Sequence, residues 1–136
     1  MRDEGFVVKL YRMERFLYTH HLRMLAKLLY YFIQLTFNCV IPPSVKIGCG
    51  LSIAHGVGIV IHHESVVGNG VKICQNVTLG GPGIVIENDC LLGAGCVVLC
   101  PCRIGTGCKI GANTVVNFNV PDNSTVVGCK GKILTR

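Results

Sequence analysis

The sequence predicts a mainly β protein, a parallel β-helix of hexapeptide repeats preceded by a helical segment. Three observations lead to this fold class. Aliphatic residues recur every six positions from Ile41 to about Val120, glycine is abundant with 17 residues, and tryptophan is absent. A chain rich in Gly, Val and Ile and poor in aromatic side chains is typical of short strands joined by tight turns.

The expected helical segment covers residues 1–37, and the repeat region with a C-terminal tail covers residues 38–136. From Tyr11 onward, apolar residues recur at three- and four-residue steps with basic residues between them. Ile41 stands before Pro42 and Pro43, so the helix should end before it. The apolar stretch 28–37 is too short to span a bilayer, which takes about 20 residues. We expect packing on the body of the protein or on a partner subunit, with contact to a membrane surface as the alternative.

The repeat determines the fold. In frames of six, an aliphatic residue comes first, glycine is frequent second, and a small residue comes fifth. The frame slips at Ile59-Val60 and at LGGPG. First and fifth side chains should point inward, and three units should close one coil, so equivalent residues stack about every 18 positions. The small fifth-position residues are Val45, Val57, Ser65, Val71, Val77, Cys90, Cys96, Cys102, Cys108 and Thr114.

Four of the nine cysteines are predicted to be core residues. An odd number of cysteines and a start without the features of a secretory leader favour free thiols in a reducing cytoplasm. Four cysteines occupy fifth positions, and Cys90 should stack on Cys108. Consecutive members of this ladder face different sides of the coil, so they cannot converge on one zinc ion. We assign no role to the others, which fall outside the inward positions: Cys39, Cys49, Cys74, Cys100 and Cys129.

The formal charge of +6 fits a phosphate-bearing cofactor, an anionic membrane or nucleic acid. No nucleic-acid-binding motif accompanies it, so we expect no nucleic-acid partner.

Two stretches carry a family resemblance: IPPSVKIGCGLSIAHGVGIVIHHESVVGNGVKICQNVTLGG and IGTGCKIGANTVVNFNVP. With H-x-x-G-I-V-I and N-V-T-L-G-G, the chain resembles the serine acetyltransferase family of left-handed β-helix acyltransferases, especially its short members from polysaccharide-biosynthesis loci. The resemblance implies a left-handed coil, a homotrimer with active sites between subunits, acetyl-CoA as cosubstrate and no metal. It implies an O-acetyltransferase that moves an acetyl group to a small hydroxyl acceptor.

His55 matches the family's catalytic histidine and lies beside the first slip of the repeat. Transfer from a thioester to an alcohol needs a base for the hydroxyl proton, and histidine is suited to that near neutral pH. The alternative is a turn histidine with only a structural hydrogen bond. Backbone N–H groups at Gly80 and Gly81 are candidates to stabilise the oxyanion. The resemblance assigns these residues to coenzyme A: Gly80, Gly81, Ala94, Lys109, Ala112, Lys130 and Lys132.

The chain also departs from the family pattern. Ala54 and Val40 stand where the family has aspartates, and the loop after T-L-G-G is shortened to Pro82-Gly83. These losses favour a sugar or another small alcohol over serine as acceptor. Asn38 is the nearest polar substitute for the missing acid, and we expect it to contact the acceptor.

Two rival functions follow from the same fold. A γ-type carbonic anhydrase needs histidines further downstream, and none follows His63. His62 and His63 should point to opposite sides of a strand, with His62 favoured as a second acceptor-binding residue. The second rival is a trimeric scaffold or regulatory subunit that binds coenzyme A and has lost catalysis.

Overall fold

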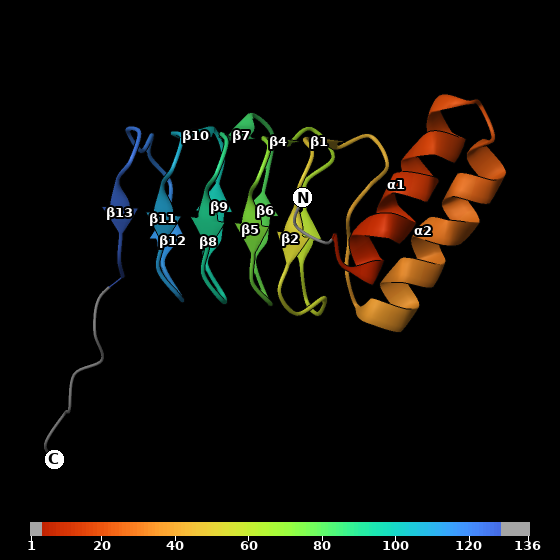
Figure 1. Ribbon diagram of the computed structural model, residues 1–136, viewed down its shortest axis with the longest axis horizontal. Helices are drawn as coiled ribbons and strands as arrows, with labels where there is room; N and C mark the ends of the chain where they lie inside the picture. Colours follow the sequence, from red (N-terminus) through yellow and green to blue (C-terminus); the bar gives the residue numbers. More distant parts are fainter. Residues whose placement is uncertain (1–3, 129–136) are drawn as a thin grey trace, which may run out of the picture.

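The hexapeptide repeats form a parallel β-helix in the computed structural model of the chain, which describes residues 4–128 (Figure 1). The strands lie on three faces, each named here by its first strand. The β1 face holds β1 (Lys46–Ile47), β4 (Val66–Val67), β7 (Ile84–Ile86) and β10 (Cys102–Ile104). The β2 face holds β2 (Ser52–Ile53), β5 (Lys72–Ile73), β8 (Leu91–Leu92), β11 (Lys109–Ile110) and β13 (Thr125–Val126). The β3 face holds β3 (Val60–Ile61), β6 (Thr78–Gly80), β9 (Val97–Leu99) and β12 (Val115–Val116).

The register confirms the expected stacking of coils. Lys109 pairs with Leu91 and Val115 pairs with Val97, both in parallel and 18 residues apart. The coil that contains the first slip is longer, because Lys46 pairs with Val66 and Ser52 with Lys72. The extra residues are therefore accommodated in turns, and the parallel ladder continues on both sides of them.

The inward positions are as predicted, with two exceptions. Val57 is wrongly placed by the six-residue frame, since its side chain is exposed and Ile59 is buried in its stead. The two inserted residues shift the frame, so Ile59 becomes the side chain two positions before Ile61. Cys39 is also buried rather than outside the core. The bridge between Val40 and Val60 aligns Cys39 with Ile59 in the stack.

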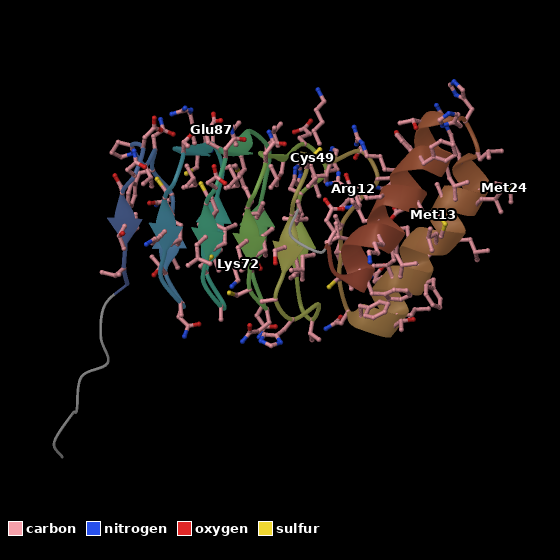
Figure 2. The ribbon with its side chains drawn as sticks, in the orientation of Figure 1. Arg12, Met13, Met24, Cys49, Lys72 and Glu87 are labelled. Carbon is pink, nitrogen blue, oxygen red and sulfur yellow. The ribbon has the colours of Figure 1, made fainter. Side chains whose placement is uncertain are left out.

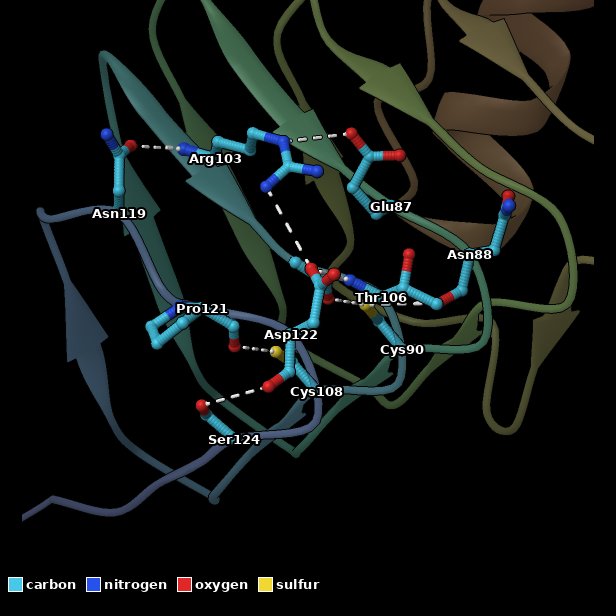
Figure 3. A network of polar contacts seen from close by, with 11 residues as sticks. Glu87, Asn88, Cys90, Arg103, Thr106, Cys108, Asn119, Pro121, Asp122 and Ser124 are labelled. Carbon is cyan, nitrogen blue, oxygen red and sulfur yellow. Dashed lines mark hydrogen bonds and ion pairs between the residues drawn. The ribbon is translucent and has the colours of Figure 1, made fainter.

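The cysteine ladder fills the core. Cys90 and Cys108 lie on adjacent coils, because the residues that follow them, Leu91 and Lys109, are paired. Their thiols donate to carbonyl oxygens, Cys90 Sγ to Gly105 at 3.0 Å and Cys108 Sγ to Pro121 at 3.0 Å (Figure 3). Burial raises the pKa of Cys96 to about 12, which keeps that thiol protonated near neutral pH. All eight cysteines that the structure describes are free thiols.

Polar side chains connect the turns between the β1 and β2 faces. The Asn69 side-chain oxygen accepts the Cys49 N–H at 2.8 Å, and the Asn88 oxygen accepts the Asn69 N–H at 2.8 Å. Near the end of the coil, the Asp122 carboxylate accepts the Thr106 N–H at 3.0 Å (Figure 3). These bonds satisfy N–H groups that the short strands leave unpaired.

One column of turn residues has left-handed backbone conformations throughout. The residues Asn38, Gly58, Asn76, Gly95 and Asn113 have φ between 51° and 70°. Glycine and asparagine tolerate this region best. Their alternation has a packing reason, because a Cβ on Gly58 would lie 2.1 Å from Asn76 Oδ1, and one on Gly95 would lie 2.3 Å from Asn113 Oδ1.

The helical segment is a hairpin of two helices rather than one continuous pattern. Helix α1 (Phe6–Thr19) and helix α2 (Arg23–Phe37) are joined by a turn in which His21 has φ 62°. In Figure 1, α1 lies against the first coil and α2 lies beyond it. Helix α2 ends at Phe37, and Asn38 caps it in a left-handed conformation. Neither helix, nor any other within residues 4–128, is long and apolar enough to cross a membrane.

Hydrogen bonds from α1 cover the open end of the coil. The Tyr11 hydroxyl donates to the Val45 carbonyl at 2.5 Å, and Arg12 donates to the Ile47 carbonyl at 2.8 Å. Arg15 donates to the Pro43 carbonyl at 3.0 Å. The first coil has no coil before it to satisfy its carbonyl groups, and these side chains take that role.

Glu14 is an anomaly in this hairpin. Its side chain is fully buried, and neither carboxylate oxygen has a hydrogen-bond partner in the described residues. Burial raises the pKa of Glu14 from 4.5 to about 8, so the neutral acid is favoured near neutral pH.

The stacked left-handed turn residues predict how adding one methyl group at Gly95 affects stability. Gly95→Ala should lower the free energy of unfolding by about 1–2 kcal/mol from conformation alone, with a further loss from the Asn113 contact. Thermal and urea unfolding will measure this change. Asn113→Gly is the matched control and should have little effect, and it should partly rescue Gly95→Ala. Wild-type stability for Gly95→Ala would contradict this account of the column.

Glu14 predicts a pH dependence of stability. The unfolded chain releases the proton near pH 4.5 and the folded chain near pH 8. Between these values the folded chain holds more protons, so stability should fall as pH rises across this window. Glu14→Gln cannot ionise, and its melting temperature should fall less than that of the wild type between about pH 5 and about pH 8. Parallel curves for the two proteins would show that Glu14 does not titrate in this way.

Candidate active site

His55 lies in the longest turn between the β2 and β3 faces. Ile53 and Ile61 are eight positions apart, whereas the corresponding residues Ile73 and Leu79 of the next coil are six apart. The two additional residues leave the stack as a protrusion, because the ladder resumes at Val60 in register with Thr78. The side chains of Ala54, His55 and Val57 are exposed on this protrusion.

Backbone hydrogen bonds hold the protrusion in place. The Val57 N–H donates to the His55 carbonyl at 2.8 Å, and the Gly58 N–H donates to the Asn38 carbonyl at 3.0 Å. A Cβ on Gly56 would lie 2.8 Å from Val7 Cγ2, so a larger residue here would require Val7 on α1 to shift. Asn38, predicted to contact the acceptor, therefore lies beside the His55 turn and contacts it through its backbone.

A cavity adjoins this turn. It has a volume of about 320 Å³ and is formed by the start of α1, the end of α2, β2 and the turn itself. It is lined by Gly5, Phe6, Val7, Phe37, Ile53, Gly56 and Val57. No lining residue carries a charge, so a carboxylate in this cavity would lack an ionic partner. Sequence reasoning missed Phe6, Val7 and Phe37 because nothing in their pattern indicates which coil turn the helices approach.

The imidazole of His55 makes no hydrogen bond with any group in residues 4–128. The nearest positions in the family pattern for an acid, Ala54 and Val40, offer no polar side-chain atom. The ring is exposed and free to turn toward a bound hydroxyl. The arrangement supplies a base without a carboxylate to orient it.

The predicted site residues lie along two different edges of one subunit. The first, here called the His55 edge, joins the β2 face to the β3 face and contains His55, Ala94 and Ala112. The Ala94 carbonyl accepts the Asn113 N–H at 2.8 Å, which places the two alanine turns on consecutive coils. Lys109 is exposed on β11, close to this edge. Lys130 and Lys132 lie outside the described residues.

The second edge joins the β3 face to the β1 face and is called here the Gly81 edge. It contains Gly80, Gly81 and His62. Gly81 has φ 116°, and a Cβ there would lie 2.2 Å from Cys100 Sγ, so only glycine fits. Its N–H donates to no group among residues 4–128 and is available to a ligand. A single subunit does not bring the two edges together, because the β3 face separates them.

His62 and His63 correct the expectation that they diverge. Strand β3 ends at Ile61, so both histidines lie in the following turn, with ring centroids 4.2 Å apart. Together with Glu64 they bring three potential metal-ligand atoms within 4.8 Å of one another. The Glu64 N–H donates to His62 Nδ1 at 3.3 Å, which leaves the proton on Nε2 in the neutral ring. That tautomer disfavours a metal at Nε2. That the protein functions without a metal stays a prediction.

The outward side of the β3 face differs from the other two faces. Its central strand positions carry Val60, Thr78, Val97 and Val115, and none is charged. The β1 face presents Lys46 and Arg103 outward, and the β2 face presents Lys72 and Lys109. Val115, the first residue of β12, is apolar and 59% exposed.

This coil of hexapeptides, with an inserted histidine turn, is a hexapeptide-repeat β-helix. Residues 83–117 match the family described as bacterial transferase hexapeptide (six repeats). A serine acetyltransferase of Helicobacter pylori (strain 26695) is 37% identical over 133 residues, covering 93% of this chain and 78% of that protein. The serine acetyltransferase of Haemophilus influenzae is 35% identical, covering 98% of this chain and 53% of that protein. The chain therefore belongs to the serine acetyltransferase family.

Solved structures agree with this assignment. A serine acetyltransferase in complex with CoA has a TM-score of 0.85 and 36% identity, covering 94% of this chain and 55% of that one. Serine acetyltransferase isoform 3 of Entamoeba histolytica, in complex with cysteine, has a TM-score of 0.86 and 30% identity, covering 96% of this chain and 49% of that one. The chain spans about half the length of the first curated relatives it matches.

Proposed function

We propose that the protein is an acetyl-CoA-dependent O-acetyltransferase that acetylates a sugar or another small alcohol lacking a carboxylate. The main support is the His55 turn, which presents an exposed imidazole and whose residues Gly56 and Val57 line an uncharged cavity of about 320 Å³. The relatives of about 36% identity are named serine acetyltransferases, and one related structure is a complex with CoA. Serine is the less suitable acceptor here, because the cavity offers its carboxylate no cationic side chain.

The proposed reaction is a direct transfer. His55 takes the proton of the acceptor hydroxyl as its oxygen attacks the thioester carbonyl carbon, and the carbonyl oxygen becomes an oxyanion. The Gly81 N–H is available to stabilise that oxyanion. Collapse breaks the carbon–sulfur bond, and the imidazolium returns its proton to the coenzyme A thiolate. Asn38 and His62 are assigned to the acceptor, and Gly80, Ala94, Lys109, Ala112, Lys130 and Lys132 to coenzyme A.

This site requires more than one subunit. His55 and Gly81 lie on opposite edges of the β3 face, so a site that uses both takes them from neighbouring copies. We infer a homotrimer in which the uncharged β3 face contributes to the contact between subunits. The same proposal includes a division into a helical segment, residues 1–37, and a β-helix with its tail, residues 38–136. It also includes a cytoplasmic location, because the free thiols fit a reducing compartment.

A second function has its own support. The unpartnered His55 and the missing acids favour a scaffold that binds coenzyme A without turnover. A peripheral contact with a membrane through residues 1–37 is compatible with either function.

Loss of the base is the first test. We expect His55→Ala to lower acceptor-dependent release of free thiol from acetyl-CoA by about 10²–10⁴-fold, since general base catalysis typically contributes that much. The assay uses serine and a panel of sugars as acceptors, and calorimetry follows coenzyme A binding. His20→Ala, which removes an exposed histidine from the turn after α1, is the matched control. Tight coenzyme A binding without turnover in the wild type would support the scaffold instead, and serine as the best acceptor would refute the proposed specificity.

The trimer is tested on the β3 face. Val115→Asp places a carboxylate in the proposed contact, and the solution mass should fall from three times 14.7 kDa toward that of one chain. Thiol release should fall with it, because the site loses the residues that the neighbouring copy supplies. Thr125→Asp on the β2 face is the control, since Thr125 is also exposed on a strand. An unchanged mass for Val115→Asp in light scattering would exclude this face from the contact.

A further inference from the structure

The outer side of the helical hairpin is apolar over both helices. On α2 the exposed residues Met24, Leu28, Tyr31 and Leu35 follow one another at helical spacing and form a single stripe. Met24 is 87% exposed, Leu28 69% and Leu35 85%. The opposite side of α2 packs inward through Ala26 and Ile33. Helix α2 therefore has two apolar sides, and only one is used within the subunit.

Further exposed apolar residues on the helical hairpin add to this stripe. Met24 projects from the outer part of the hairpin, away from the coil (Figure 2). We define the hairpin patch as the stripe together with the exposed residues Met13, Phe16, Leu22, Leu25 and Phe32. An apolar patch of this kind on a folded protein marks a surface that binds a partner or a membrane.

The charges near the patch have one sign. Arg23 and Lys27 are exposed beside the stripe, and the Lys27 ammonium lies 5.9 Å from the centre of the Tyr31 ring. Between residues 5 and 37 the only carboxylate side chain is Glu14, which is fully buried. The patch thus presents apolar and cationic groups together, with no exposed acid on either helix.

A cavity lies next to the two cations. It has a volume of about 300 Å³, and its lining includes Tyr18, Tyr30, Arg23 and Lys27. Aromatic rings beside basic side chains are the combination that suits the boundary between lipid headgroups and acyl chains.

We propose that the hairpin patch docks on a membrane surface rich in anionic lipids. The apolar stripe enters the headgroup boundary, and Arg23 and Lys27 bind lipid phosphates. A second copy fits the patch less well, because a face-to-face pair would bring the cations of both copies together without an acid to neutralise them. The docking does not require that the proposed acetyl transfer occurs, since neither His55 nor Gly81 takes part in it.

Vesicle co-sedimentation of the full chain tests the proposal. We expect binding to phosphatidylcholine vesicles that contain about 30% phosphatidylglycerol, weak binding to pure phosphatidylcholine, and release by high salt. The double variant Arg23→Gln/Lys27→Gln should bind about 30-fold more weakly, since each cation contributes about fivefold. Met24→Gln/Leu28→Gln/Leu35→Gln should lose binding through the apolar stripe. All five residues are exposed, and circular dichroism will verify the fold of each variant.

Lys46→Gln/Lys72→Gln is the matched control, because it removes two exposed cations from the coil. Its binding should equal that of the wild type. If Lys46→Gln/Lys72→Gln weakened vesicle binding as much as Arg23→Gln/Lys27→Gln, the effect would be general charge attraction. That outcome would overturn the proposal. Absence of binding to anionic vesicles would also overturn it. A doubled solution mass that is lost in Met24→Gln/Leu28→Gln/Leu35→Gln would also overturn the proposal. The patch would then be a contact between copies.

Discussion

Stacked left-handed turn residues are the constraint on which the structure depends. At the His55 edge every coil turns through a residue with positive φ, and glycine alternates there with asparagine. The asparagine side chain of one coil occupies the space over the glycine of the coil before it. This packing keeps successive turns aligned, so strands of only two or three residues remain in register. The inward aliphatic residues can then form one continuous core.

The candidate site lies where two residues are added to the repeat while the left-handed turn residue is kept. Gly58 keeps the left-handed turn, and Ile59 returns an apolar side chain to the core. The additional residues can leave the stack, and His55 leaves with them. The regular repeat is thus interrupted at the residue proposed as the base, while the coils on both sides follow it.

The inner and outer surfaces of the protein differ in composition. The inner side is uniform, with aliphatic residues and cysteines stacked along the coil. The outer side differs from face to face: the β3 face is uncharged, the β2 face carries lysines, and the hairpin is apolar and cationic. Burial of Glu14 contributes to this division, because it removes the hairpin's one carboxylate from the surface between residues 5 and 37.

Much of the fold was determined by the sequence alone, because inward positions and turn residues recur at short range. The repeat predicted the parallel coil and the stacking of Cys90 on Cys108, and Pro42-Pro43 predicted that the helices end before Ile41. The family motif led to His55. Tertiary structure alone decided that Val57 is exposed, that Cys39 is buried and that His62 and His63 lie side by side. It also decided which helix residues line the cavity and that His55 and Gly81 lie on separate edges. These features depend on how an inserted turn and a hairpin pack against neighbouring coils, and local spacing carries no information about such contacts.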